Sequence, residues 1–319
     1  TIGDAVERIA FPNYHITQIE TGATIDLQKM GDEIGNALFA GRISQRFAEQ
    51  LHLQHDKRTG VRIRLHIDDE NIAQIPWETI RFNHEYLGLR PRTPIVRYVA
   101  ADAPSTTILV TGALRVLGIV SSPSDMHKLD VEKEQKALTE VLQPLIAKNV
   151  MEISWLLKVD AQQLRNAVRR FRPHIIHYIG HGIYDEKQSE GYLLFINNEE
   201  KAERISATTF TTLLRDSEIR FIFLNACQSG RTSGGLAETL VRRGIPAALG
   251  MQTNVRDDLA IAFATEFYSA LGEGLPVDAA TVEGRMAIVN KSNIEQPNWA
   301  QPVLYMRSPN GQLFTKTAL

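Results

Sequence analysis

The sequence has a single cysteine among its 319 residues and no long uninterrupted apolar run. One cysteine excludes an intramolecular disulfide framework and a zinc site built from cysteines alone, and it suits a reducing compartment. Without a run of about 20 apolar residues, no segment is expected to span a membrane. The first residues also lack the basic and then apolar order of a secretion signal. We therefore expect a cytoplasmic protein with no membrane partner.

The sequence also lacks an excess of either charge. Its formal net charge is −2, so it offers no general positive field for a phosphate backbone, and direct binding of nucleic acid is not expected. It contains neither a G-x-G-x-x-G turn nor a G-x-x-x-x-G-K-[ST] loop, which argues against the alternative of a nucleotide-binding domain. We expect no cofactor. Hydrophobic residues make up 43% of the chain, which is enough for a substantial core.

From residue 114 onward, short apolar runs alternate with segments of helical periodicity. This alternation predicts a mostly parallel sheet with helices on both faces. Strands are expected at 114–122, 151–159, 174–180, 219–226, 247–255 and 301–308. Helices are expected at 129–149, at 160–171 with Asp160 as its cap, at 236–244 with Gly244 as its stop, at 259–274 and at 278–291.

The first hundred residues are less regular. They suggest one helix at 31–51, strands at 61–67 and 95–99, and a buried tryptophan, Trp77, in the segment IPWETIRF. The linker ADAPSTT predicts a boundary near residue 105. The chain then divides into an N-terminal α+β region (1–105) and a second domain (106–319).

The role of the N-terminal region is open from sequence alone: a lid, a prodomain, or extra strands on the main sheet. The partner of Glu78 is equally open, and the candidates are Arg81, Arg90, Arg92 and Arg97.

Three histidines, His174, His177 and His181, fall within eight residues. On a helix they would share one face, which is a metal-ligand geometry. Pro173 before them and the glycines around His181 favour instead a strand that ends in a turn. In a strand His174 and His177 face opposite sides, so we interpret both as hydrogen-bonded interior or rim residues. His181 follows the last apolar residue of the run and is therefore the candidate functional residue.

The single cysteine, Cys227, also follows an apolar run, at 219–226. Carboxyl ends of parallel strands share one rim, where ligands bind, and adjacent strands lie ~4.8 Å apart. A thiol with a pKa of about 8.5 needs a base, and an imidazole at the neighbouring strand end supplies one. We therefore predict a nucleophile, Cys227, and a base, His181. The backbone N–H groups of Gly182 and Cys227 are placed to hold the oxyanion.

These residues resemble a known family. A strand ending in His181 and Gly182, followed by a strand ending in Asn-Ala-Cys-Gln-Ser-Gly (225–230), is similar to the caspase-type cysteine peptidases and most closely to the bacterial CHAT domains. The segments LGIVSSP, IPWE and IVRY extend the likeness over roughly residues 30 to 310. The resemblance implies a caspase-like three-layer αβα sandwich around a mostly parallel sheet of about six strands.

The same resemblance implies a substrate pocket near the dyad. Asn225, two positions before the nucleophile, stands where caspases have glutamine and metacaspases aspartate, so the preferred substrate residue stays open. Asp125 follows the first strand of the second domain, Gln252 lies in the fifth, and Asp257 or Asp258 follows the fifth. Asp125, Gln252 and Asp258 are further candidates for substrate binding. Loop carboxylates such as Asp125 and Asp258 also commonly cap helices or face solvent, and this alternative stays open.

The resemblance implies an intracellular cysteine endopeptidase. It would cleave a specific protein substrate through a Cys–His dyad, under the control of a partner protein or effector domain, in bacterial signalling or antiphage defence. The alternative is a catalytically silent scaffold or protein-interaction module with the same fold, because fold alone does not establish function.

Overall fold

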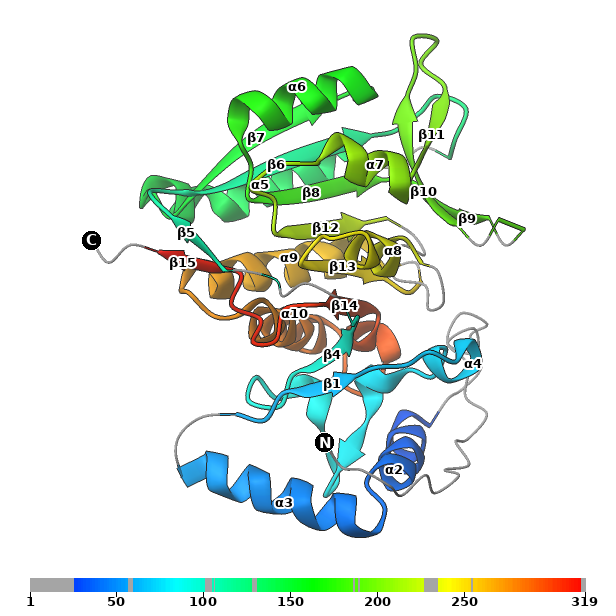
Figure 1. Ribbon diagram of the computed structural model, residues 1–319, viewed down its shortest axis with the longest axis vertical. Coiled ribbons are helices and arrows are strands. Elements are labelled where there is room, and N and C mark those ends of the chain that lie inside the picture. The colour runs from blue at the N-terminus through cyan, green and yellow to red at the C-terminus, as the bar shows by residue number, and fades with distance from the viewer. Residues whose placement is uncertain are drawn as a thin grey trace.

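An eight-stranded sheet forms the centre of the molecule (Figure 1). The computed structural model describes residues 26–56, 60–100, 105, 107–127, 131–185, 187–188, 190–226, 235–253 and 255–316. In sheet order, the strands are β1 (Ile63–Leu65), β4 (Ile95–Tyr98), β14 (Pro302–Met306), β13 (Ala247–Met251), β12 (Phe221–Asn225), β8 (Ile175–Gly180), β6 (Leu114–Ser121) and β7 (Met151–Leu157). Neighbouring strands are parallel, except that β14 is antiparallel to β13.

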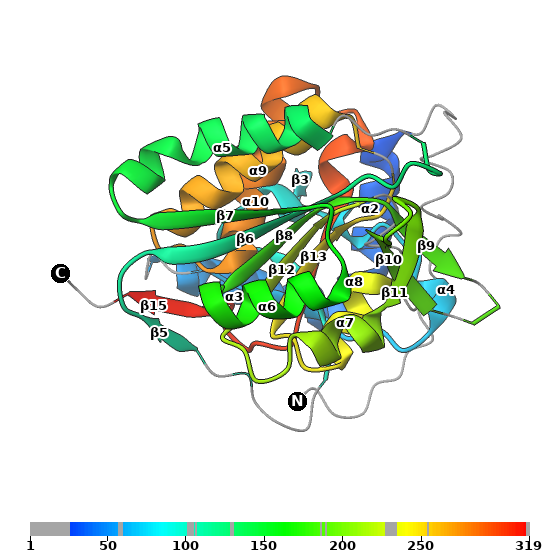
Figure 2. The same ribbon diagram turned by 90° about the horizontal axis from the view of Figure 1, so that it is seen from above.

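Helices cover both faces of this sheet (Figure 2). One face carries α5 (Val131–Ala147), α9 (Asp257–Gly272) and α10 (Val277–Lys291). The other face carries α6 (Ala161–Phe171), α7 (Ala207–Leu213) and α8 (Leu236–Arg242). The predicted three-layer sandwich is therefore confirmed, and the six strands from β14 to β7 correspond to the expected sheet.

Alternating side chains of the sheet build two cores, one on each face. In β12, Phe221 and Phe223 point toward α9, where their rings lie 5.2 Å from Phe267 and 5.7 Å from Phe263, respectively. Ile222, between them, belongs to the second core beneath α6, α7 and α8. Because both faces are covered, the strand sequence is a continuous apolar run rather than an alternating one.

Two helix boundaries follow the local signals that the sequence contains. The Asp160 carboxylate accepts a hydrogen bond from the backbone N–H of Gln163 at 2.7 Å, and the Gln163 side chain accepts one from the Asp160 N–H. This capping box satisfies two N–H groups that the first turn of α6 would leave unpaired. Just beyond α8, Gly244 has a φ of +115°, which favours glycine, so the predicted stop is confirmed.

The N-terminal region adds strands to the main sheet. β4 pairs with β14, with Tyr305 opposite Arg97, and β1 pairs with β4. The sequence left open whether this region is a lid, a prodomain or a source of extra strands, and the structure shows extra strands on the main sheet. The predicted boundary near residue 105 falls between β4 and β5 (Ile108–Val110), and the division into two domains stays a prediction.

The N-terminal segment expected to form one helix forms two, α2 (Leu27–Leu38) and α3 (Gly41–Asp56). The chain leaves the helical conformation at Phe39, where φ is −97° and ψ is 49°, and Gly41 has a φ of +52°. The ring of Phe39 stacks 4.5 Å from that of Phe47. The single-helix prediction was wrong because this aromatic contact and the permissive glycine turn the chain between two helical segments.

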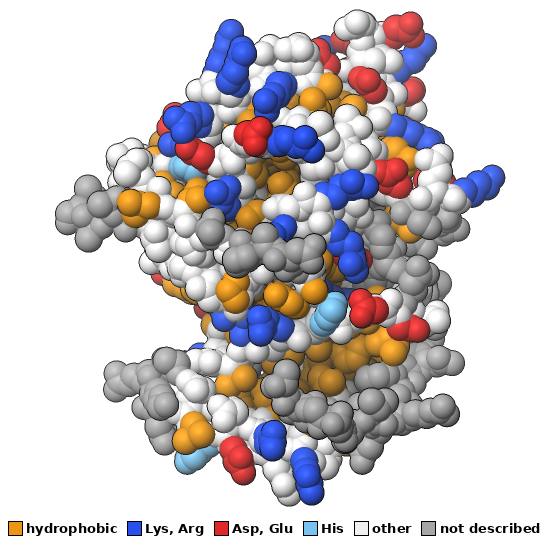
Figure 3. All heavy atoms as spheres, in the orientation of Figure 1, with side chains coloured by type: hydrophobic (Ala, Val, Ile, Leu, Met, Phe, Trp, Pro, Cys, Tyr) orange, Lys and Arg blue, Asp and Glu red, His pale blue; other side chains and the backbone are white. Residues whose placement is uncertain are grey.

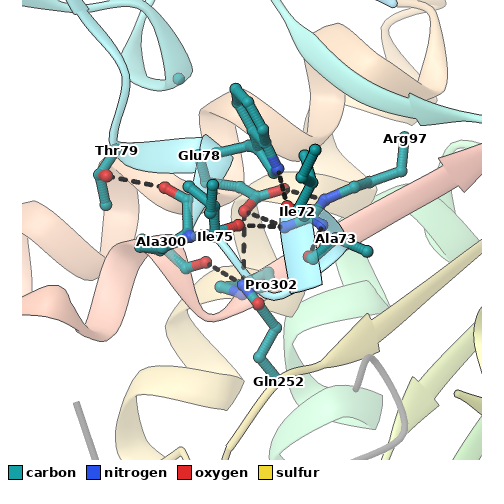
Figure 4. A network of polar contacts seen from close by, with 12 residues as sticks. Ile72, Ala73, Ile75, Glu78, Thr79, Arg97, Gln252, Ala300 and Pro302 are labelled. Atoms are coloured by element: carbon teal, nitrogen blue, oxygen red, sulfur yellow. Dashed lines mark hydrogen bonds and ion pairs between the residues drawn. The ribbon is translucent and has the colours of Figure 1, made fainter. Parts of the chain in front are cut away.

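A buried polar cluster joins the N-terminal region to the second domain (Figure 4). Glu78 accepts hydrogen bonds from Arg97 Nε and Nη2 at 3.1 and 2.9 Å, and the Gln252 amide lies 3.4 Å from it. Burial lowers the pKa of Arg97, but the Glu78 carboxylate outweighs that effect and the pKa is raised overall. Arg97 is therefore the partner of Glu78, which the sequence alone did not identify among the four candidate arginines. Trp77 beside it is buried, as predicted, and donates to the Ile72 carbonyl at 2.8 Å.

Smaller sheets flank the main one. β9 (Gly182–Asp185), β10 (Glu190–Ile196) and β11 (Ala202–Ser206) form an antiparallel sheet, and β5 pairs with β15 (Phe314–Lys316). The sequence patterns did not predict β9, β5 or β15. The remaining elements are α4 (Glu70–Ala73), η1 (Trp77–Thr79), β2 (Arg81–Phe82), β3 (Glu85–Tyr86), η2 (Leu87–Leu89) and η3 (Pro297–Ala300).

Within the described ranges, no helix combines the length and apolar character that crossing a membrane requires.

Candidate active site

Two neighbouring strands lead to the predicted catalytic residues. β8 and β12 are parallel and pair directly, with Ile179 opposite Asn225. His181 follows the last residue of β8, so it lies at the carboxyl edge of the sheet, and its side chain is partly exposed. Cys227 comes two positions after the end of β12 and lies outside the described residues. The pairing of its thiol with His181 therefore stays a prediction.

The imidazole of His181 has a defined partner on one side. Its Nε2 lies 2.7 Å from the backbone carbonyl oxygen of His127, in the loop that follows β6. A carbonyl oxygen only accepts hydrogen bonds, so Nε2 must carry the proton. In the neutral ring, Nδ1 is then left with its lone pair. The arrangement fixes both the tautomer and the orientation of a base.

A buried tyrosine holds the backbone of His181 in place. The Tyr178 hydroxyl lies 3.0 Å from the His181 carbonyl oxygen and 2.8 Å from that of Leu194, and the Leu194 N–H donates to the His181 carbonyl at 3.1 Å. Burial raises the pKa of Tyr178 well above its ordinary value, so the hydroxyl keeps its proton and acts as a donor. Ser121 adds a third link, since its hydroxyl donates to Leu194 O at 2.6 Å.

Gly180 is required by the close packing at this point. A Cβ atom there would lie 2.6 Å from the Ser121 carbonyl oxygen and 2.6 Å from the Tyr178 hydroxyl. Contacts of that length are not tolerated when one partner is backbone. The glycine before His181 therefore allows the end of β6 and the Tyr178 hydroxyl to pack directly against the end of β8.

The other two histidines are interior residues, as predicted. His174 Nδ1 accepts from the backbone N–H of Arg115 at 3.0 Å, and His177 Nδ1 lies 2.9 Å from the Tyr268 hydroxyl. Burial lowers the pKa of His177 to about 3, and burial together with the positive charge of Arg115 lowers that of His174 to about 4. Both rings are therefore neutral at physiological pH. Among the described residues, no group of three or more histidine, cysteine, aspartate or glutamate side chains is arranged to hold a metal ion.

Two of the predicted substrate-binding residues lie near the rim. Asn225, at the end of β12, donates from its side-chain amide to Glu134 of α5 at 3.1 Å. Asp125, in the loop after β6, accepts from the backbone N–H of Ala202 at 2.8 Å and so ties this loop to β11. The Asp125 carboxylate thus has a structural partner, and substrate binding by either residue stays a prediction.

The other two predicted substrate-binding residues differ in exposure. Gln252 is only 2% exposed, and its amide donates to the Ala300 carbonyl at 3.0 Å in the buried cluster of Glu78. Asp258, in the first turn of α9, pairs with Arg256 at 2.9 Å on the surface. Gly182, the predicted oxyanion donor, begins β9 opposite Leu193. These three roles also stay predictions.

Sequence reasoning missed the residues that support the site rather than form it. Glu134, Tyr178 and the carbonyl of His127 were not named. A signal existed for Tyr178, because a hydroxyl within a strand covered on both faces must find a partner. No comparable signal marks Glu134, which is one of several acidic residues on α5.

Comparison with solved structures shows the class of fold. The complex of the RgpB pro- and mature domains of Porphyromonas gingivalis aligns with a TM-score of 0.52 and 14% identity, over 93% of this chain and 77% of that chain. The crystal structure of the Arg-specific cysteine proteinase gingipain R (RgpB) gives 0.49 and 14%, over 91% and 75%. The separase–securin complex of Saccharomyces cerevisiae gives 0.42 and 18%, over 66% of this chain and 13% of that chain. The likeness to RgpB at a TM-score above 0.5 shows that the chain shares the caspase-like fold of that protein.

The chain belongs to the CHAT domain family, whose sequence model matches residues 28–307. This confirms the resemblance seen in the sequence and includes most of the N-terminal region as well as the second domain. A comparison with curated proteins gave no significant match.

Proposed function

We propose that this CHAT domain is a cysteine endopeptidase that uses Cys227 as nucleophile and His181 as general base. The observation that carries the proposal is the position and tautomer of His181. Its imidazole lies at the carboxyl edge of the sheet, its Nε2 proton is committed to the His127 carbonyl at 2.7 Å, and its Nδ1 is left as a proton acceptor.

The register of the two strands supports the pairing of the dyad. Ile179 of β8 is opposite Asn225 of β12. His181 and Cys227 each follow these positions by two residues, so the same register carried forward would bring positions 181 and 227 level. At a strand spacing of ~4.8 Å, a thiol and an imidazole at level positions are within reach of each other.

The proposed chemistry transfers one proton in each direction. His181 Nδ1 takes the proton from the Cys227 thiol, and the thiolate attacks the carbonyl carbon of the scissile peptide bond. The imidazolium then returns the proton to the leaving amine, which gives a thioester. A water molecule, deprotonated by the same imidazole, hydrolyses the thioester and releases the thiolate.

Gly182 is well suited to hold the oxyanion in this scheme. The Leu194 N–H donates to the His181 carbonyl, which makes Gly182 and Leu193 a pair that does not exchange hydrogen bonds. The N–H of Gly182 therefore points away from β10. We propose that this N–H and that of Cys227 stabilise the tetrahedral intermediate.

Substrate, control and setting are proposed at the level that the family resemblance allows. The substrate is a specific protein, bound with the help of Asn225, Asp125, Gln252 and Asp258. The activity is released by a partner protein or effector domain, in the cytoplasm of a bacterium, in signalling or antiphage defence. Neither nucleic acid nor a membrane takes part directly.

The test is cleavage that depends on the thiol. The chain is incubated with candidate partner proteins, with Cys227→Ala and His181→Ala variants beside it, and products are identified by mass spectrometry. The proposal predicts a discrete product with the wild type that neither variant forms. Equal cleavage by the wild type and Cys227→Ala refutes it. A chain that binds a partner without cutting it, with an ordinary thiol pKa, would be a scaffold.

A further inference from the structure

A cavity lined by arginines lies at the opposite rim of the sheet from His181. It has a volume of about 340 Å³ and lies between the loop from α7 to β12, the loop from α8 to β13 and the end of β14. Four arginines line it, Arg215, Arg220, Arg243 and Arg307, with one carboxylate, Asp216. Among the described residues, four positive charges against one negative leave a local excess of +3, in a chain whose formal net charge is −2.

A second cavity adjoins the first and enlarges the positive region. Its volume is about 270 Å³, and it shares Arg215, Asp216 and Ser217 with the first. It adds Arg165, Arg169 and Arg172 but only one further carboxylate, Glu218, which pairs with Arg172. Counting the residues that the structure describes, the two cavities together carry seven arginines and two acids, an excess of +5. Basic side chains also gather over α6 on the face shown in Figure 3.

The requirements of helix ends do not explain this cluster. Arg215 and Arg243 follow the carboxyl ends of α7 and α8, where positive charge is favourable. Arg220 and Arg307 belong instead to strand ends, immediately before β12 and after β14. Burial lowers the pKa of Arg220, as expected for a cation that has lost water without gaining an equivalent carboxylate. Four arginines from three separate segments therefore converge on one hollow.

The exposed arginines of the first cavity are available to a ligand. The guanidinium groups of Arg215 and Arg243 form no hydrogen bond or ion pair with another described residue, and both side chains are exposed. The Ser217 hydroxyl stands beside them as a further donor, whereas those of Thr211 and Thr212 donate to backbone carbonyls of α7. Planar guanidinium forks match the oxygens of phosphate in geometry and in charge.

We propose that these two cavities bind a small ligand with two or more phosphate groups. One phosphate carries a charge of about −1.5 to −2, which cannot balance an excess of +3 in the first cavity alone. No aromatic side chain lines either cavity within the described part of the chain, so the site offers no surface for stacking a base. The recognised chemistry is the phosphate chain itself, in a hollow within the size range of small-molecule sites.

The site lies at the amino end of β12, the strand that leads to Cys227, and is separate from the candidate active site. The cavity touches Arg220, immediately before β12, and Asn225, the last residue of that strand, lies five residues further on, which at ~3.3 Å per residue is roughly 17 Å away. A ligand that joins the loops before β12 and β13 would stabilise the pairing of these two strands. The proposal stands on the arginine cluster and does not depend on peptidase activity.

The test is calorimetric titration of the full chain with sodium tripolyphosphate at constant ionic strength. The expected result is one saturable site, with binding weakened about tenfold for each arginine removed in Arg215→Gln and Arg243→Gln, and about a hundredfold in the double variant. Arg170→Gln is the matched control, because Arg170 is an exposed arginine at the end of α6 outside both cavities. It should bind as the wild type does.

Three results would overturn the proposal. The first is the absence of saturable binding. The second is equal weakening in the Arg170→Gln control, which would mean a general attraction between charges. The third is binding of a polyglutamate peptide in preference to tripolyphosphate, which would indicate that an acidic protein segment is the ligand. Because Arg215 and Arg243 are exposed and form no side-chain hydrogen bond or ion pair with another described residue, the variants should fold. A thermal unfolding scan of each without ligand checks this point.

Discussion

Replacing Glu78 by glutamine should destabilise the chain strongly, because it leaves a buried guanidinium without its counter-charge. The side chains of Glu78 and Arg97 are 1% and 5% exposed, and their closest N–O distance is 2.9 Å. Removing one member of such a pair typically costs about 3–5 kcal/mol. Arg97 keeps its hydrogen bonds to the carbonyls of Ala73 and Ile75, at 2.6 and 3.3 Å, which places the expected cost near the lower end, about 3 kcal/mol.

Thermal unfolding followed by tryptophan fluorescence measures this effect, since Trp77 lies next to Glu78 and is 2% exposed. At about 2 °C for each kcal/mol in a chain of this size, the midpoint should fall by about 6 °C. Glu85→Gln is the matched control, because Glu85 pairs with Arg90 at 2.6 Å but both side chains are largely exposed, and its cost should stay below about 1 kcal/mol. Equal midpoints for the two variants would refute the reasoning.

Three further predictions concern the second domain. His177→Phe should reduce the loss of stability on acidification, because the pKa of His177 is lowered to about 3 in the fold and only the unfolded chain gains this proton between pH 6 and 5. The slope of the unfolding free energy against pH should fall by about 1 kcal/mol per pH unit in this range. An unchanged slope contradicts the burial argument. Tyr178→Phe should lower the free energy of unfolding, measured by chemical denaturation, by about 1 kcal/mol. It should also slow the alkylation of Cys227 at pH 7, but less than His181→Ala does. No effect on either measurement would mean that the hydroxyl does not hold His181. Gly180→Ala should cost about 1–3 kcal/mol through its contacts with Ser121 and Tyr178, whereas Gly272→Ala, whose Cβ meets only flexible ends of Leu145 and Val150, should cost clearly less.

The main sheet could be predicted from sequence because each of its strands carries a strong local signal. Strands covered on both faces, such as β8 and β12, read as apolar runs that end in polar residues. The helices between them show a 3.6-residue period and clear caps, as Asp160 and Gly244 illustrate. Local pattern and tertiary packing agree in these elements, so short-range reasoning was sufficient.

The elements that were missed depend on partners far away in the chain. β5 and β15 are three residues each and pair across more than two hundred positions. β9 is a strand because β10 returns to pair with it, and its own sequence, GIYD, carries little signal. The break between α2 and α3 similarly reflects the contact of Phe39 with Phe47.

The candidate site was only partly predictable for the same reason. The spacing of His181 and Cys227 from the ends of two apolar runs identified the strands that carry them, and the structure shows these strands as direct neighbours. The partners that orient His181 come from a loop backbone and from β10, and a backbone carbonyl leaves no trace in a sequence. The sequence likewise did not indicate which of four arginines pairs with Glu78, whereas the pairing of β4 in the sheet places Arg97 beside Glu78.

Because Cys227 is the only cysteine in the chain, its thiol can be titrated without interference. The rate of iodoacetamide alkylation of the wild type and of His181→Ala is measured from pH 5 to pH 10. A dyad predicts a wild-type midpoint well below the ordinary thiol value of about 8.5 and a return toward that value in His181→Ala. Identical midpoints near 8.5 in both proteins would contradict a catalytic pairing of Cys227 with His181.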